Sequence, residues 1–131
     1  GHEPRVALLC HANFGYPQGA RADQVNGAVA ILDSASRDFE YDGGMAPDVA
    51  LDMDMMELYP FCRLTGPANV LIMPSLNAAS ISAKILQKLG SGTVIGPLLM
   101  GLDNTAQIAR MDATVSDLVN HAALAAHDAL S

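Results

Sequence analysis

The hydrophobic pattern of residues 67–102 predicts a strand, a helix and a second strand in succession. Ala68–Met73 is an apolar run of strand length. Hydrophobic side chains then recur at four-residue spacing up to Gly90, as in an amphipathic helix, at Ile81, Ile85 and Leu89. A second apolar run follows at Thr93–Ile95 and Leu98–Met100. Two such runs around one helix are typical of a right-handed βαβ unit, whose helix N-terminus lies at the ligand-binding edge of a parallel sheet.

The second apolar run is interrupted by Gly96 and Pro97. Proline donates no hydrogen bond to a sheet ladder, so a central strand is disfavoured at this point. Two interpretations are open. In one, the strand ends or bulges at Ile95. In the other, the backbone is held open beside a ligand cleft.

The rest of the chain supplies further elements of the same kinds. Strands are predicted at Arg5–Cys10 and Arg37–Tyr41, and helices at Asp23–Ala35, Pro47–Leu58 and Thr114–Ser131. Asp42-Gly43-Gly44 predicts a turn after the strand at Arg37–Tyr41 and before the helix at Pro47–Leu58. This alternation indicates an α/β fold, a three-layer α/β/α sandwich with a mainly parallel sheet, formed by residues 1–131 as a single domain. A strand beginning at residue 5 leads us to expect a fragment of a longer chain, with Gly1 and His2 interpreted as an expression scar.

Composition narrows the possible functions. The chain has 131 residues, seven Lys and Arg against 14 Asp and Glu, and a net charge of −7. So few cations predict no nucleic-acid partner, and no apolar run approaches the ~20 residues of a membrane span. The two cysteines, Cys10 and Cys62, form no disulfide or metal-binding motif, so a cytoplasmic location is expected. No metal site is predicted either, because Asp52, Asp54 and Glu57 do not share a helix face.

Three segments resemble a known family: PSLNAASISAKILQKLG, then TVIGPLLMGL, and TVSDLVN near the end. They are similar to phosphate acetyl/butyryl transferases, and more closely to the C-terminal phosphotransacetylase-like domain of bacterial hybrid malic enzymes. The resemblance implies one domain of the isocitrate/isopropylmalate dehydrogenase-like fold. It aligns Asp117 with an active-site aspartate, but Arg110 and Met111 stand where the family has a serine–arginine pair. No catalytic residue is therefore predicted, and Asp117 is interpreted mainly as the partner of Thr114 in a helix cap.

The resemblance also implies a ligand site, for acetyl-CoA. Its phosphates need cations and free N–H groups, which the loop and first turn after Ala68–Met73 supply. We expect the site to include the following residues: Pro74, Asn77, Ser80, Lys84, Lys88, Gly96, Pro97 and Asp117. Lys84 and Lys88 lie one helical turn apart and are the best-placed cations, although two solvated lysines would show the same spacing.

Three functions follow from these observations. The first is a catalytically silent regulatory and oligomerisation domain of a malic enzyme, with acetyl-CoA as allosteric inhibitor. The second is an active phosphate acetyltransferase, and the third a purely structural oligomerisation module. The resemblance implies homodimers or higher homo-oligomers and N-terminal malic enzyme domains in the full-length protein. It places NADP and a divalent metal (Mg or Mn) in those domains and no cofactor in this chain.

Overall fold

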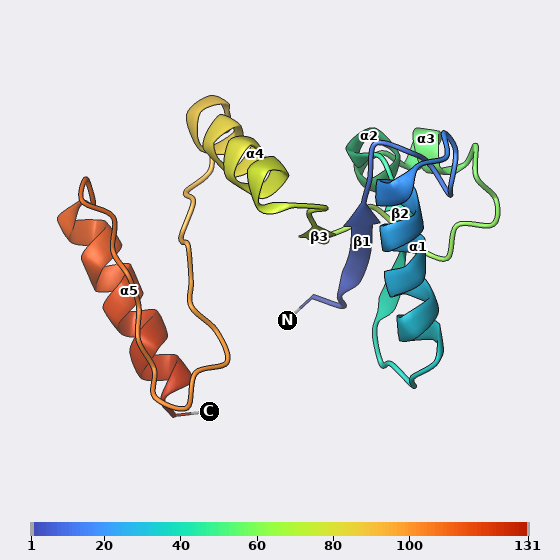
Figure 1. Ribbon diagram of the computed structural model, residues 1–131. Coiled ribbons are helices and arrows are strands. Elements are labelled where there is room, and N and C mark those ends of the chain that lie inside the picture. Colours follow the sequence, from blue (N-terminus) through green and yellow to red (C-terminus); the bar gives the residue numbers. More distant parts are fainter. Residues whose placement is uncertain (1, 131) are drawn as a thin grey trace. The chain divides into compact units, whose positions relative to one another are not determined.

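The computed structural model describes residues 2–130 (Figure 1). The chain divides into two compact units, the first ending at Lys84 and the second beginning at Ile85, and each unit is described by itself. The expectation of a single domain over residues 1–131 stays a prediction. Among the described residues, no helix is long and apolar enough to cross a membrane.

The first unit is built on a parallel sheet of three strands in the order β2-β1-β3. The strands are β1 (Arg5–Leu9), β2 (Glu40–Met45) and β3 (Val70–Ile72). Central strand β1 pairs Val6 with Tyr41 on one side and with Val70 on the other. The predicted α/β fold with a parallel sheet is therefore confirmed.

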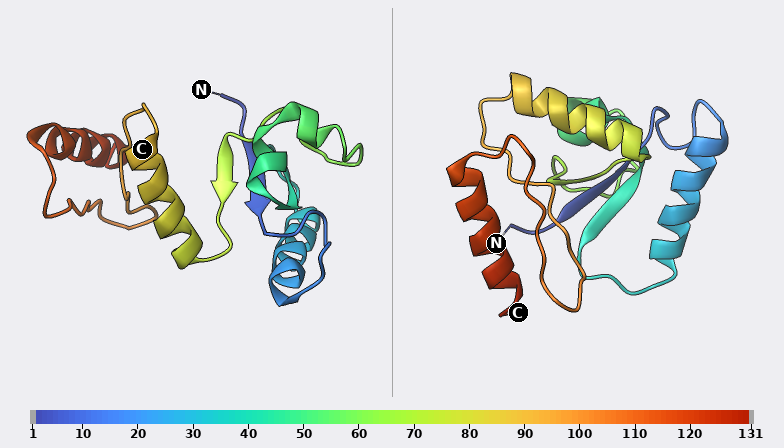
Figure 2. Two further views of the ribbon diagram at one scale, coloured as in Figure 1. Left: turned by 90° about the horizontal axis from the view of Figure 1, so that it is seen from above. Right: turned by 60° about the vertical axis from the view of Figure 1, so that its left-hand side comes forward.

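Helices cover both faces of this sheet (Figure 2). Successive side chains of β1 point to opposite faces, so each face offers apolar side chains to a layer of helices. Leu8 packs against α1 (Ala20–Asp33), in a core that also holds Val25 and Val29. Ala7 and Leu9 face the opposite way, toward the helices α2 (Pro47–Leu51) and α3 (Met53–Met56). The predicted layering of helix, sheet and helix thus occurs within the first unit.

Several local predictions were wrong. The expected turn at Asp42-Gly43-Gly44 lies inside β2, where a Cβ at Gly43 would approach the carbonyl oxygen of Leu8 to 2.6 Å. Glycine is needed at position 43 because the two strands pack closely there. The turn propensity of glycine led to the wrong prediction. The expected helix Pro47–Leu58 is broken at Asp52, whose backbone is extended. The Asp52 carboxylate caps α3, because its Oδ1 accepts a hydrogen bond from the Asp54 N–H at 2.9 Å.

The second unit contains the end of α4 (Leu76–Leu89) and all of α5 (Val115–Asp128). The predicted end of α4 before Gly90 and the predicted N-cap of α5 at Thr114 are confirmed. Thr93–Met100, however, forms no strand. The backbone of Leu99 instead makes two hydrogen bonds of 3.1 Å with the side chain of Gln107, which replaces a neighbouring strand. The expected second strand of the βαβ unit was therefore wrong.

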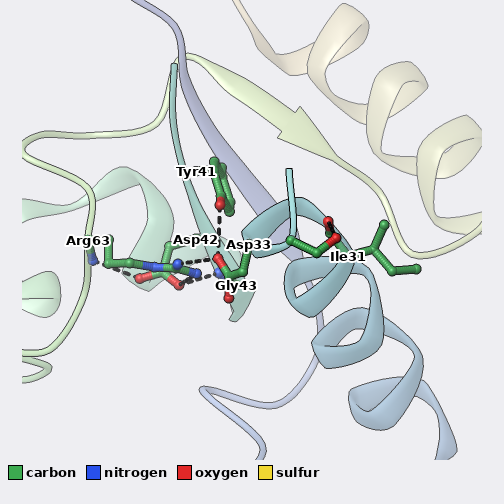
Figure 3. Close-up of polar contacts among 7 residues, drawn as sticks. Ile31, Asp33, Tyr41, Asp42, Gly43 and Arg63 are labelled. Carbon is green, nitrogen blue, oxygen red and sulfur yellow. Dashed lines mark hydrogen bonds and ion pairs between the residues drawn. The ribbon is translucent and has the colours of Figure 1, made fainter. Parts of the chain in front are cut away.

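Polar side chains tie the first unit together beside β2 (Figure 3). The Arg63 guanidinium donates to Asp33 at 2.6 Å and to Asp42 at 3.2 Å, and the Tyr41 hydroxyl also donates to Asp33. These bonds hold the pKa of Asp33 below its ordinary value, first through Arg63 and then through Tyr41. The network joins α1, β2 and the segment after α3.

Candidate functional site

The second unit has a polar cavity of about 200 Å³ between the end of α4, the first turns of α5 and the connection between these helices. The residues lining it are Gln87, Lys88, Val94, Ile95, Gly96, Arg110, Asp112, Ala113, Thr114, Asp117, Asn120 and His121. Charged and amide groups are well represented in this wall. A concave site with a few convergent polar groups is the usual form of a small-ligand site.

Arg110 is held in the wall by two neighbours. Its Nε and Nη2 donate to the two carboxylate oxygens of Asp112 at 2.9 and 2.6 Å, and Nη1 donates to Gln87 Oε1 at 3.1 Å. The planar guanidinium suits this two-point pairing. The interactions use most of its hydrogen-bonding capacity, so Arg110 shapes the cavity more than it attracts an anion.

Asp117 completes a capping box at the start of α5. Its Oδ2 accepts from the N–H and the hydroxyl of Thr114, both at 2.8 Å, while the Asp117 N–H donates to Thr114 Oγ1 at 3.2 Å. The backbone bond from Thr114 lowers the pKa of Asp117 most, followed by the Thr114 hydroxyl and the charges of His121 and Arg110. The capping interpretation of Asp117 is confirmed.

Lys88 and His121 differ from these residues in their hydrogen bonding. No hydrogen bond or ion pair joins the Lys88 ammonium to another described residue. His121 is 9% exposed, and its Nδ1 is shielded from solvent with no partner among the described residues. Asn120, which also lines the cavity, likewise has no side-chain hydrogen bond to another described residue, so the polar groups available to a ligand include Lys88, Asn120 and His121.

Gly96 contributes backbone to the same wall. Its φ of +137° lies in a region that L side chains rarely adopt, so glycine is required at this position. Pro97 follows it and is not among the lining residues. The open backbone proposed at Gly96 thus lies beside a cavity, although no strand surrounds it.

The cavity brings together three of the expected acetyl-CoA residues: Lys88, Gly96 and Asp117. Four others belong to the first unit: Pro74, Asn77, Ser80 and Lys84. Lys84 donates to Ser80 Oγ at 3.2 Å, and Ser75 accepts the N–H of Ala78 at the start of α4. Pro74 borders a small apolar pocket beside α1 and the ends of β1 and β3.

Sequence reasoning did not select His121. The available signal was its spacing from Asp117, since residues four apart share a helix face. For metals, no group of three or more His, Cys, Asp or Glu side chains converges anywhere in residues 2–130. The described chain therefore offers no evident set of metal ligands.

Comparisons with known proteins agree with the resemblance described above. The family model for phosphate acetyl/butaryl transferase matches residues 1–126. The NADP-dependent malic enzyme of Rhizobium meliloti is 60% identical over 129 residues, which are 98% of this chain and 17% of that protein. The phosphate acetyltransferase of Paracoccus denitrificans is 36% identical over 125 residues, which are 95% of this chain and 39% of that protein.

The fold has a solved counterpart as well. A phosphotransacetylase from Streptococcus pyogenes superposes with a TM-score of 0.91 at 27% identity, covering 98% of this chain and 40% of that one. The chain thus spans well under half of the transferases and about a sixth of the malic enzyme that it matches.

Proposed function

This chain belongs to the phosphate acetyl/butaryl transferase family, and we propose that it is the regulatory and oligomerisation domain of a malic enzyme. In this proposal the full-length protein carries N-terminal malic enzyme domains, which oxidatively decarboxylate malate to pyruvate with NADP and Mg or Mn. Identity of 60% to a malic enzyme over nearly the whole chain supports this parent. The location proposed for the protein is the cytoplasm.

Acetyl-CoA is the proposed effector, and the cavity at α5 is the observation that carries the proposal. It collects Lys88 and Asp117, which the family resemblance singles out, and Gly96, which the break in the second apolar run singles out. Its volume of about 200 Å³ lies below the ~300–1,000 Å³ of sites that enclose a drug-sized ligand. We therefore assign it one group of the effector, with the remainder bound outside the cavity.

The proposed domain is catalytically silent. Phosphoryl and acyl transfer need preorganised cations where charge develops in the transition state. At the family's serine–arginine positions this chain has Arg110, whose guanidinium is occupied by Asp112 and Gln87, and Met111, which is fully exposed and carries no charge. Neither side chain replaces the serine and the arginine of the family.

Apolar surface supports the proposed homo-oligomerisation. Leu89 of α4 is 83% exposed, and Val115 of α5 is 80% exposed. Further large apolar side chains are exposed on the same two helices, at Ile85, Leu86, Leu118 and Val119. Surfaces of this kind are commonly covered by a neighbouring domain or subunit, so we propose a homodimer or a higher homo-oligomer.

Active phosphate acetyl transfer is the second candidate, because the relatives include phosphate acetyltransferases. Titration calorimetry of the chain and of the longer enzyme with acetyl-CoA tests the regulatory proposal directly. Saturable binding to both, with inhibition of malate turnover in the longer enzyme, is the expected result. An absence of binding to either protein would leave only the structural role. Formation of acetyl phosphate above a buffer blank, lost in Asp117→Asn, would favour the second candidate.

A further inference from the structure

The connection between α4 and α5, residues 90–114, is the longest stretch of the described chain without a helix or strand. It supplies Gly96 and Arg110 to opposite ends of the cavity wall's sequence, before and after the middle of the connection. Loops of this length without secondary structure are uncommon in compact domains, and many of them are functional. Because no helix or sheet ladder holds its backbone, the shape of this connection depends on a few individual contacts.

Gln107 and Leu99 form the contact that joins the two halves of the connection. The Gln107 amide donates from Nε2 to the Leu99 carbonyl oxygen, and its Oε1 accepts the Leu99 N–H, both at 3.1 Å. Within residues 2–130, no other hydrogen bond joins the outgoing half, residues 93–100, to the returning half, residues 103–110. A side-chain amide has the donor and the acceptor of a peptide unit, so Gln107 satisfies both backbone groups of Leu99.

This pair lies outside the cavity but close in sequence to both sides of its wall. Leu99 and Gln107 are not among the lining residues. Leu99 follows Gly96 by three residues, and Gln107 precedes Arg110 by three. Three residues of extended chain span at most about 10 Å. The pair therefore limits how far the Gly96 side of the wall can move from the Arg110 side.

We propose that Gln107 is a positioning residue, whose amide closes the connection and so fixes the two sides of the cavity wall against one another. This action requires no contact with a ligand, since Gln107 does not line the cavity. A binding site needs such support, because a wall that shifts by about 1 Å loses its geometry. The inference rests on the proposed function only in taking this cavity as a ligand site, and it adds a residue that the sequence had not singled out.

Amide hydrogen exchange followed by nuclear magnetic resonance measures this closure in the unsubstituted chain. After correction for intrinsic rates, the Leu99 N–H should exchange at least ~10-fold more slowly than the Met100 N–H, as expected for about one net hydrogen bond. Met100 is a suitable reference because its N–H donates to no acceptor among the described residues. Equal corrected rates for the two residues would overturn the inference.

Replacing Gln107 by methionine keeps the size of the side chain and removes its donor and acceptor. In Gln107→Met the Leu99 N–H should exchange ~10-fold faster or more, and the resonances of the Gly96 N–H and the Arg110 Nε–H should both shift. The matched control is Asn104→Leu, which is exposed in the same connection, makes no hydrogen bond with another described residue, and should change none of these signals. Faster exchange at Leu99 with unmoved Gly96 and Arg110 resonances would overturn the inference, because Gln107 would then hold only a local turn.

A milder variant, Gln107→Glu, keeps the test decisive if Gln107→Met fails to fold. At neutral pH its carboxylate still accepts from the Leu99 N–H but has no donor for the Leu99 carbonyl oxygen. Exchange of the Leu99 N–H should therefore be faster than in the original chain and slower than in Gln107→Met. Exchange as slow as in the original chain would show that the donated bond contributes nothing, and would overturn the two-point closure.

Calorimetric titration with acetyl-CoA separates this inference from the proposed function. Binding that is about 10-fold weaker in Gln107→Met and unchanged in Asn104→Leu would support both. Full affinity in Gln107→Met, despite shifted Gly96 and Arg110 resonances, would support the positioning by Gln107 and contradict this cavity as the acetyl-CoA site. An original chain that binds no acetyl-CoA would contradict the proposed effector, whereas the exchange rates and resonances would still decide the inference about Gln107.

Discussion

Replacing Arg63 by methionine removes the centre of the network that joins α1, β2 and the segment after α3 (Figure 3). The guanidinium bridges Asp33 and Asp42, and its Cζ lies 5.0 Å from the ring centroid of Tyr41. Methionine keeps most of the aliphatic volume but no charge. The variant therefore tests the electrostatic part of the network with little change in packing.

The two carboxylates contribute differently to the expected loss of stability. The Asp33 side chain is 47% exposed, so solvent screens its ion pair and the contribution is small. The Asp42 side chain is 6% exposed, and a buried charge that loses its partner costs about 3–5 kcal/mol when nothing compensates it. Asp42 keeps the backbone N–H groups of Gly43 at 2.9 Å and residue 63 at 2.7 Å. We therefore expect a loss of about 2 kcal/mol in the free energy of unfolding.

Urea denaturation followed by circular dichroism at neutral pH measures this quantity. The matched control is Asp33→Asn, which weakens the exposed ion pair and the hydrogen bond from the Tyr41 hydroxyl but leaves the Arg63–Asp42 pair in place. It should lose clearly less stability than Arg63→Met. The slope of unfolding free energy against urea should stay unchanged in both variants. If Arg63→Met loses less than roughly 0.5 kcal/mol, the range typical of surface substitutions, the burial argument for Asp42 is refuted. Equal losses in the two variants would refute it too.

Four further predictions concern the cavity, its cap and the proposed assembly. Lys88→Met should raise the acetyl-CoA concentration for half-maximal inhibition of the longer enzyme at least ~10-fold, since a charge-assisted contact is lost. Lys84→Met, outside the cavity, should change this concentration little, and equal effects of the two variants would contradict the assigned site. Because the folded-state pKa of Asp117 is depressed, its cap should stabilise α5 at neutral pH and lose this effect only as the pH falls below about 4. Denaturation followed by circular dichroism should show that Asp117→Asn loses less stability in acid than the original chain does, and an unaltered pH profile would reject the cap as the cause of that loss. Acetyl-CoA and phosphate should give no acetyl phosphate with this chain, as a coupled assay can establish, because the serine–arginine pair is absent. Sedimentation equilibrium at tens of micromolar should give a multiple of the 13.7 kDa chain mass, whereas a monomer mass would contradict the proposed homo-oligomer.

Local chemistry was sufficient to predict several elements. The apolar run at Arg5–Cys10 contains β1, the four-residue repeat ending before Gly90 gives α4, and the Thr114–Asp117 box starts α5. Each depends on residues within a few positions of one another, where helix periodicity, capping and strand burial act directly. The α/β class followed because these elements alternate along the chain.

Tertiary structure decided the elements whose partners lie far along the chain. The sequence alone favours a turn at Gly43. The structure shows that a Cβ at Gly43 would lie 2.6 Å from the carbonyl oxygen of Leu8 in the neighbouring strand. Thr93–Met100 has the composition of a strand, but a strand forms only when a neighbour takes up its backbone hydrogen bonds. The side chain of Gln107 takes that place at Leu99.

The site divides in the same way. Family resemblance selected Lys88 and Asp117, the Gly-Pro interruption of an apolar run selected Gly96, and the cavity contains all three. The resemblance could not select His121, because the property that distinguishes this residue is a buried ring nitrogen with no hydrogen-bond partner in residues 2–130. Composition and spacing do not determine burial or hydrogen-bond pairing. Both are set by which distant groups the fold brings next to a side chain, so only the tertiary structure could single out His121.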